Sequence, residues 1–264
     1  MNDLHEQAAR WDQWAPHYDE DTRNQDPGPA ADGLARLAGE GKALELGIGT
    51  GRVAFALADR GIPVFGLDAS PEMIRRLEEH QDRLPAGRPA VRARLGDMAL
   101  FDLGIRYPLI YISASTFFLL TSQEAQVSCF RSAARHLTPD GHFVIEAAVP
   151  HTSGMAAERQ QMIVREMSEH HLKWSAFVHD SVAQTVHAQE VRIGPAGYRL
   201  LPNVMRYAFP SELDLMAQLA GLRLERRTAN WDDSPFTTIS THHVSLYSHQ
   251  PADSAAPSPA GDTA

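Results

Sequence analysis

A regular alternation of strand-like and helix-like segments limits the fold of this 264-residue chain more than any other feature. Short apolar runs alternate with amphipathic segments, as in a parallel sheet with helices on both faces. The predicted strands cover residues 42–46, 63–67, 91–95, 109–113, 141–147, 222–229 and 239–247. The predicted helices cover residues 52–60, 71–81, 122–136 and 212–220, with Ser70, Ser122 or Thr121, and Ser211 as N-caps. The sequence therefore predicts an α/β fold with a doubly wound, mostly parallel sheet.

Segments that interrupt this alternation indicate how the chain divides. Residues 1–40 are predicted to form a helical cap, because an amphipathic pattern from Leu4 to Tyr18 precedes a break rich in Pro and Gly. A nucleotide-binding domain would then comprise residues 41–150 and 210–248.

Residues 151–209 differ in composition from the segments on either side. They are rich in Val, Ile and aromatic residues, with turn signals at residues 179–180 and 194–197. This pattern predicts an antiparallel β meander of three or four strands, inserted after the fifth strand of the sheet. The sequence leaves open whether the meander covers a substrate or forms the contact of a homodimer. The Pro-, Ala- and Ser-rich residues 249–264 are expected to be disordered.

Charge and composition argue against several classes of function. The net charge is −9 and the basic residues are scattered, so no nucleic acid partner is expected. The single cysteine, Cys129, allows neither an internal disulfide nor a multi-cysteine metal site. No segment has the roughly 18 consecutive apolar residues of a membrane span, and the N-terminus lacks the apolar core of a signal peptide. We therefore expect a cytoplasmic protein without a membrane partner.

Three glycines in alternate positions follow the first predicted strand. They belong to the segment Glu45-Leu46-Gly47-Ile48-Gly49-Thr50-Gly51-Arg52. Glycines at such a turn let a ligand approach the backbone closely, and the following helix offers free N–H groups. The segment is not the dinucleotide fingerprint, whose third glycine would fall at Arg52, and it lacks the Gly-Lys-Ser/Thr of a P-loop.

Acidic residues end the next two predicted strands. Asp68 follows the glycine loop by about twenty residues, a position from which a carboxylate can accept both hydroxyls of a ribose. Asp97, in the segment Gly96-Asp97-Met98, suits the exocyclic amine of an adenine, and Met98 can supply a backbone N–H and an apolar wall. The ligand is therefore expected to be an adenosine without a pyrophosphate, carrying a small zwitterionic tail over the glycine loop.

Together these motifs resemble the class I S-adenosylmethionine-dependent methyltransferases. In that family an E/D-x-G-x-G-x-G loop holds the methionine part of the cofactor, and acids after the second and third strands bind ribose and adenine. The resemblance implies S-adenosyl-L-methionine as cofactor and a seven-stranded Rossmann-like sheet in the order 3-2-1-4-5-7-6, with the last strand antiparallel. It implies as cofactor-binding residues Tyr18, Glu45, Gly47, Ile48, Gly49, Thr50, Gly51, Arg52, Asp68, Ala69, Met73, Gly96, Asp97, Met98 and Ser113. Packing against the N-terminal helix explains Tyr18 equally well.

The segment after the fourth strand narrows the subclass within this resemblance. It reads Ser113-Ala114-Ser115-Thr116-Phe117. Methyltransferases of nucleic acid bases carry Asn or Asp-Pro-Pro-aromatic there, and the magnesium-dependent catechol type carries an acidic metal ligand. Neither pattern is present, so we expect metal-independent methyl transfer to an O, N or C atom of a small molecule, in secondary metabolism.

Candidate residues for the acceptor site lie mostly near the meander. His179, beside Asp180, is the candidate general base, because a neighbouring carboxylate can orient and charge an imidazole. Arg206 would suit a carboxylate or phosphate on the acceptor, or would pair with Glu146 or Asp214. The full set of candidate substrate-binding residues is Phe117, Glu146, Arg206, Tyr207 and Trp231.

The adjacent His242 and His243 have no assigned role in the site. Strand alternation predicts that one lies in the core and the other at the surface.

Two other uses of the same cofactor cradle remain open at this stage. The first is non-methylating chemistry, by aminopropyl transfer or cyclisation of the cofactor's methionine chain. The second is a non-catalytic, cofactor-binding regulatory subunit. An aminopropyl transferase should have additional acids around the glycine loop, and Ile48–Arg52 contains none.

Overall fold

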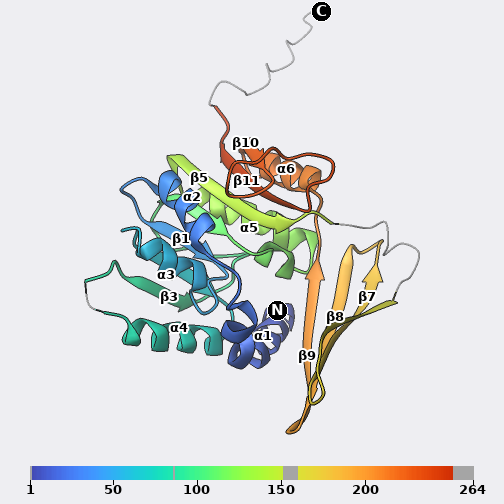
Figure 1. Ribbon diagram of the computed structural model, residues 1–264. Helices are drawn as coiled ribbons and strands as arrows, with labels where there is room; N and C mark the ends of the chain where they lie inside the picture. Colours follow the sequence, from blue (N-terminus) through green and yellow to red (C-terminus); the bar gives the residue numbers. More distant parts are fainter. Residues whose placement is uncertain (1, 86, 151–159, 252–264) are drawn as a thin grey trace, which may run out of the picture.

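The computed structural model describes residues 2–85, 87–150 and 160–251 and contains two β-sheets with helices around the larger one (Figure 1). Most of the predicted tail, residues 252–264, and the first residues of the predicted meander, 151–159, lie outside the described residues. No helix in the described part of the chain is long and apolar enough to cross a membrane.

The larger sheet has seven strands in the order β10-β11-β5-β4-β1-β2-β3. Their bounds are β1 Ala43–Leu46, β2 Val64–Asp68, β3 Val91–Leu95, β4 Tyr107–Ile112, β5 Leu137–Ala148, β10 Leu222–Thr228 and β11 His242–His249. The first five strands run parallel, whereas β11 pairs antiparallel with both β5 and β10. The predicted order 3-2-1-4-5-7-6 with an antiparallel last strand is therefore confirmed.

Helices cover both faces of this sheet (Figure 1). They are α1 Asn2–Thr22, α2 Gly28–Ala38, α3 Arg52–Ala58, α4 Pro71–Arg83, α5 Gln123–His136 and α6 Pro210–Leu219, with a 3-10 turn η1 at Thr116–Leu119. Successive strand residues point to opposite faces, so Leu109 packs in the core cluster under α2 and α3, and Ile110 in the cluster under α5 and α6. Residues that alternate along each strand therefore build one core on each face of the sheet.

The ends of the helices test the predicted caps. Ser70 and Ser122 are the N-caps of α4 and α5, and each hydroxyl accepts a hydrogen bond from a backbone N–H at 3.1 Å. Ser211 is not the cap of α6, which was wrongly predicted. That helix begins at Pro210, two residues before the predicted start, because proline suits the first helical position. The carboxylate of Glu212 accepts a hydrogen bond from the backbone N–H of Phe209 at 2.9 Å.

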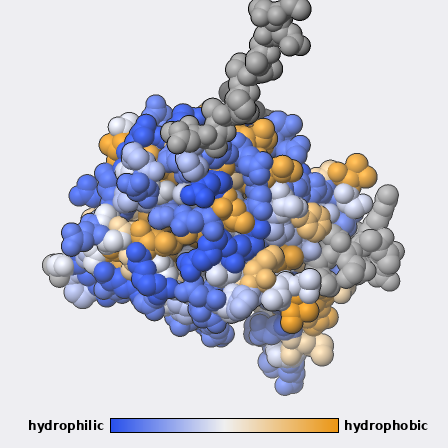
Figure 2. Space-filling model, turned by 90° about the horizontal axis from the view of Figure 1, so that it is seen from above, coloured by the Kyte–Doolittle hydropathy of each residue, from blue (hydrophilic) through white to orange (hydrophobic). Residues whose placement is uncertain are grey.

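The second sheet contains four antiparallel strands in the order β6-β7-β8-β9, as predicted for the meander. Their bounds are β6 Gln160–Met167, β7 Leu172–Asp180, β8 Thr185–Gly194 and β9 Gly197–Arg206. This sheet projects from one side of the molecule, and β9 leads back to α6 (Figure 1). Hydrophobic side chains lie at the surface on this side (Figure 2), where Met162 and Met167 are 69% and 77% exposed.

Candidate functional site

A cavity of about 480 Å³ lies at the carboxyl ends of the parallel strands, where open α/β sheets bind ligands. Its walls come from α1, the glycine loop, the ends of β2 and β3, and the segment between β4 and α5. The predicted cofactor residues that line it are Tyr18, Gly47, Gly49, Asp68, Ala69, Met73, Gly96, Asp97 and Met98. The structure therefore brings the glycine loop and both predicted acids to one space.

The glycine loop adopts a backbone that other residues rarely adopt. Gly47, Gly49 and Gly51 have φ values of 74°, 56° and 88°. A Cβ at Gly47 would lie 2.3 Å from the Cγ2 of Thr116, so a side chain there has no space. The N–H groups of Gly47 and Ile48 both donate to the carbonyl of Leu67, at 2.8 and 3.0 Å. The end of β2 therefore fixes the loop.

Asp68 connects the glycine loop to the start of α4. Its Oδ2 accepts a hydrogen bond from the N–H of Gly49 at 2.7 Å, and its Oδ1 accepts one from the N–H of Ser70 at 2.9 Å. Burial raises the pKa of Asp68, while these backbone hydrogen bonds act to lower it. Each carboxylate oxygen has a second lone pair, so Asp68 can still accept hydrogen bonds from a ligand's hydroxyls.

Asp97 lies at the same edge of the sheet, after β3. Its Oδ1 accepts a hydrogen bond from the N–H of Ala99 at 2.7 Å, which fixes the turn that carries Met98. Both Asp97 and Met98 line the cavity, next to Leu67. This end of the cavity combines a hydrogen-bond acceptor with apolar walls, as a purine with an exocyclic amine requires.

The remaining predicted cofactor residues do not line the cavity. They are Glu45, Ile48, Thr50, Gly51, Arg52 and Ser113. Glu45 is buried at the end of β1, where its carboxylate accepts hydrogen bonds from the hydroxyls of Tyr111 at 2.9 Å and Ser113 at 3.1 Å. Burial raises the pKa of Glu45 to about 8, opposed by these two hydrogen bonds. Glu45 therefore links the end of β1 to the end of β4, just before the glycine loop.

The helix α1 forms a wall of the cavity that sequence analysis found only in part. Tyr18 was predicted, whereas Gln7 and Trp11 were not. The Nε2 of Gln7 donates to the carbonyls of Leu119 and Val204, at 2.9 and 3.1 Å. The amphipathic spacing of Trp11 was visible in the sequence and could have identified this wall.

His179 and Tyr207 form a buried pair away from the main cavity. The Nε2 of His179 lies 2.9 Å from the Tyr207 hydroxyl. Asp180, the partner predicted for His179, is exposed, and its Oδ1 accepts hydrogen bonds from the N–H groups of Val182 and Ala183. Burial raises the pKa of Tyr207.

Arg206 is buried among side chains of the protein. Its guanidinium donates to Gln126, to Gln184 at 3.0 Å and to Glu212 at 3.3 Å. The predicted pairing with Glu146 or Asp214 is therefore wrong. Asp214 pairs with Arg227 on the neighbouring strand β10 at 2.6 Å.

Glu146 and Trp231 line a second cavity of about 330 Å³, together with Arg52 and Ser115. The Oε2 of Glu146 accepts a hydrogen bond from the N–H of Ala114 at 3.0 Å, at the end of β4. This cavity lies beside the main one, because Ser115 and Thr116 are consecutive and line one cavity each.

The structure also shows the burial of Phe117, His242 and His243, which the sequence analysis named. Phe117 is fully buried and packs edge-on against Phe130 at 5.5 Å between ring centroids. His243 is fully buried and His242 is exposed, so the prediction of one core and one surface histidine is confirmed.

Comparison with known proteins finds one matching family model and several similar methyltransferases. A family model described as "Methyltransferase domain" matches residues 43–141. The CcbJ methyltransferase from Streptomyces caelestis is 36% identical, with a TM-score of 0.85 over 93% of this chain and 99% of that one. The cypemycin N-terminal methyltransferase from a Streptomyces species is 27% identical over 207 residues, covering 78% of this chain and 82% of that protein.

A third relative has a bound cofactor. CalS10 from Micromonospora echinaspora, an amino pentose methyltransferase with S-adenosylmethionine bound, is 20% identical. Its TM-score is 0.63, over 87% of this chain and 95% of that one. At this identity the likeness concerns the fold alone.

Proposed function

As a member of the class I S-adenosylmethionine-dependent methyltransferases, the chain is an enzyme that uses S-adenosyl-L-methionine, and we propose that it methylates an amine nitrogen of a small natural product. We take the transfer to be metal-independent, because Ser113 stands where the magnesium-dependent type has an acidic ligand. The hydroxyl of Ser113 donates to Glu45 instead.

The strongest support for a cofactor site in the main cavity is the pair of carboxylates at the ends of the adjacent strands β2 and β3. Asp68 and Asp97 both line the main cavity, one beside the glycine loop and one beside the apolar wall of Met98. Both are hydrogen-bond acceptors, which suits the hydroxyls of a ribose and the amine of an adenine. The residues present therefore fit an adenosine whose methionine tail lies over Gly47 and Gly49.

The protein's contribution to transfer is alignment and exclusion of water. When bound, S-adenosylmethionine supplies a methyl group on a positively charged sulfur. A nucleophile attacks the methyl carbon in line with the carbon–sulfur bond, and the sulfur leaves. Gly47 and Gly49 allow close approach to the backbone, and the rings of Trp11 and Tyr18 form the wall opposite the strand ends. A fixed and dry approach lowers the entropic cost of bringing acceptor and methyl group together.

Nitrogen as the acceptor atom is supported by one relative and by the second cavity. That relative is named as an N-terminal methyltransferase. In the second cavity a half-buried carboxylate, Glu146, lies with the indole of Trp231. A carboxylate and an aromatic face both attract an ammonium group, and the carboxylate can accept the proton that the ammonium must lose before its nitrogen can attack.

Transfer of a labelled methyl group tests the proposed acceptor. Purified protein is incubated with methyl-labelled S-adenosylmethionine and matched pairs of compounds, such as an amino sugar and the same sugar with a hydroxyl in place of the amine. Label on the amine member alone supports the proposal. Label on the hydroxyl member, or on carbon, contradicts it.

Two candidate bases can be distinguished in the same assay. We assign proton acceptance to Glu146, so Glu146→Gln should lower kcat about 100-fold with little change in cofactor binding. His179→Gln should have a smaller effect, since His179 lies outside the main cavity and contacts Tyr207. The reverse order of effects would return His179 to the role predicted from the sequence.

A further inference from the structure

Three consecutive acidic residues near the end of α1 face three different surroundings. The Oδ1 of Asp19 accepts a hydrogen bond from the Thr50 hydroxyl at 2.6 Å, in the glycine loop. Glu20 is exposed and pairs with Arg23, just after the end of α1, at 3.8 Å. Asp21 pairs with Lys173 on β7 at 3.0 Å and also contacts Arg192 on β8. The helix therefore has one side on the seven-stranded sheet and its other helices, which we call the body, and another side on the four-stranded sheet.

Two carboxylates join α1 to the body, and each follows an aromatic residue of the cavity wall. Asp12 comes after Trp11, and its Oδ1 accepts hydrogen bonds from the Ser70 hydroxyl at 2.6 Å and from the N–H of Glu72 at 3.2 Å. The first turn of α4 is electropositive because its N–H groups are unpaired within the helix, so it favours this contact.

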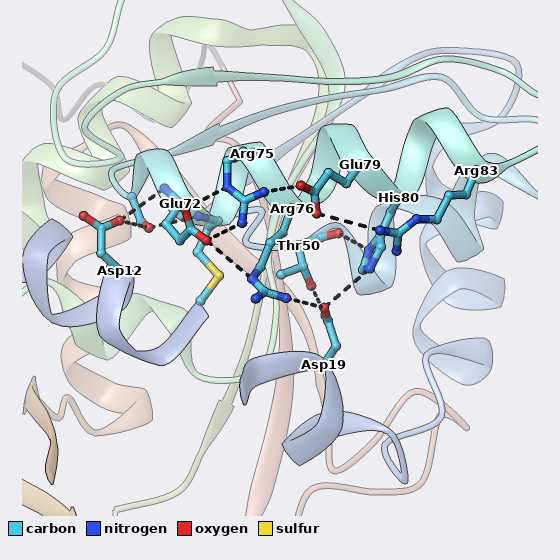
Figure 3. A network of polar contacts seen from close by, with 11 residues as sticks. Asp12, Asp19, Thr50, Glu72, Arg75, Arg76, Glu79, His80 and Arg83 are labelled. Carbon is cyan, nitrogen blue, oxygen red and sulfur yellow. Dashed lines mark hydrogen bonds and ion pairs between the residues drawn. The ribbon is translucent and has the colours of Figure 1, made fainter. Parts of the chain in front are cut away.

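Asp19 comes after Tyr18, the other aromatic residue of the wall. Besides Thr50, its carboxylate lies 3.4 Å from the Nε2 of His80 and 3.9 Å from the guanidinium of Arg76. Figure 3 shows both acids projecting from α1 towards α4 and the glycine loop, where they enter one network of polar contacts.

The opposite side of α1 is joined to the four-stranded sheet along most of its length. The Trp14 indole donates to the carbonyl of Pro202 at 2.9 Å, and Gln7 donates to that of Val204 at 3.1 Å. Arg199 contacts His17 one turn further along α1. Together with the pairs of Asp21, these contacts attach α1 to β9 and its neighbours.

We infer that Asp12 and Asp19 are positioning residues that fasten α1 over the cofactor, and that α1 and the four-stranded sheet move together when this fastening opens. The fastening holds Trp11 and Tyr18 against the cavity, so breaking it frees the wall through which a nucleoside leaves. The inference rests on the cofactor site of the proposed function and not on the identity of the acceptor.

The dissociation rate of S-adenosylhomocysteine from the full-length protein tests this inference, measured by stopped-flow displacement with Trp fluorescence. Asp12→Ala and Asp19→Ala should each raise this rate about tenfold, because each removes a hydrogen-bonded carboxylate. Asp19→Asn keeps an oxygen for the Thr50 hydroxyl and should have a smaller effect. The KM for S-adenosylmethionine should rise more than kcat changes, a split that a loss of stability alone would not produce.

The two neighbouring acids provide the controls. Glu20→Ala removes a solvent-facing carboxylate and should leave the dissociation rate within about twofold of wild type. Asp21→Ala cuts a contact with the sheet and should also leave the rate near wild type. A rate raised as much by Asp21→Ala as by Asp19→Ala would mean that α1 opens away from the sheet, which overturns the joint movement.

Each remaining outcome also has a definite meaning. Unchanged dissociation in both Asp12→Ala and Asp19→Ala, with wild-type binding intact, overturns the fastening. Absence of nucleoside binding in the wild type overturns the cofactor site itself. Should one alanine variant fail to fold, as judged by circular dichroism, the other variant and Asp19→Asn decide the result.

Discussion

In the seven-stranded sheet, β1 is buried along its whole length, whereas in the four-stranded sheet β6 is exposed at all residues but one. The first sheet lies between two apolar cores, and its glycine loop is fixed by backbone N–H groups that donate to Leu67. The second sheet is attached to α1 by side chains, among them Trp14 and Asp21. Backbone and core thus define the cofactor cavity, and a few polar side chains define what covers it.

The largest effect on stability is expected in the body. Phe130 is fully buried, and its ring lies within 5.5 Å of the centroids of three other rings, those of Phe117, Phe143 and Tyr247. Phe130→Ala should lower the free energy of unfolding by about 3–5 kcal/mol, through lost burial and a cavity. Urea unfolding followed by circular dichroism measures it. A loss below about 1 kcal/mol would mean that this core is not the main source of stability.

A buried acid in the body should make stability depend on pH. The pKa of Glu45 is raised by burial to about 8, above its ordinary value of 4.5. The folded state therefore holds a proton that the unfolded state has lost, so stability falls as the pH rises from about 4.5 to about 8. Because each pKa unit corresponds to about 1.4 kcal/mol, the fall across this range should be about 4 kcal/mol, and Glu45→Gln should remove it. Urea unfolding at pH 5 and pH 8 measures the change in the free energy of unfolding for wild type and Glu45→Gln. An equal change in both proteins would contradict the assignment.

A single contact between α1 and the sheet should have an intermediate effect. Trp14→Phe keeps an aromatic ring and removes the indole N–H that donates to Pro202. The free energy of unfolding should fall by about 1 kcal/mol, as for the loss of one hydrogen bond. Hydrogen exchange should show the change in β9 and not in β1. Faster exchange in β1 would mean that the two regions do not behave separately.

The smallest effect is expected on the outer strand of the second sheet. Met162 is 69% exposed on β6, so Met162→Ala should change the free energy of unfolding by no more than about 0.5 kcal/mol. The same urea experiment on Phe130→Ala gives the loss of free energy of unfolding in the body. The difference between the two losses measures the contrast between the two regions. A loss above about 1.5 kcal/mol would indicate that a second copy of the chain covers this strand, and gel filtration would check that explanation.

The body was predictable because its signals are local and periodic. Short apolar runs between amphipathic segments predicted the strands, and the spacing from Gly47 to Asp68 and Asp97 predicted which strand ends meet. Caps such as Ser70 follow from the same local chemistry. The exception is Ser211, where the preceding Pro210 starts the helix two residues earlier than predicted.

The partners of polar side chains were not predictable, because they join residues far apart in the chain. The sequence offers several acids as possible partners of Arg206. Its contacts with Gln126 and Glu212 depend on how α5 and α6 pack. His179 pairs with Tyr207, which lies 28 residues further along the chain. The same limit hid Asp12 and Asp19, whose partners lie on other elements.

Calorimetric titration of S-adenosylhomocysteine into wild type, Asp68→Ala and Asp59→Ala tests the cofactor cavity most directly. Asp59 is the control, because it is a partly exposed acid that pairs with Arg88 at 2.8 Å and lies outside the cavity. Micromolar binding by wild type and Asp59→Ala, weakened about 100-fold or more in Asp68→Ala, is the predicted result. Equal binding by all three proteins, or none by the wild type, would contradict the assignment of this cavity to the cofactor.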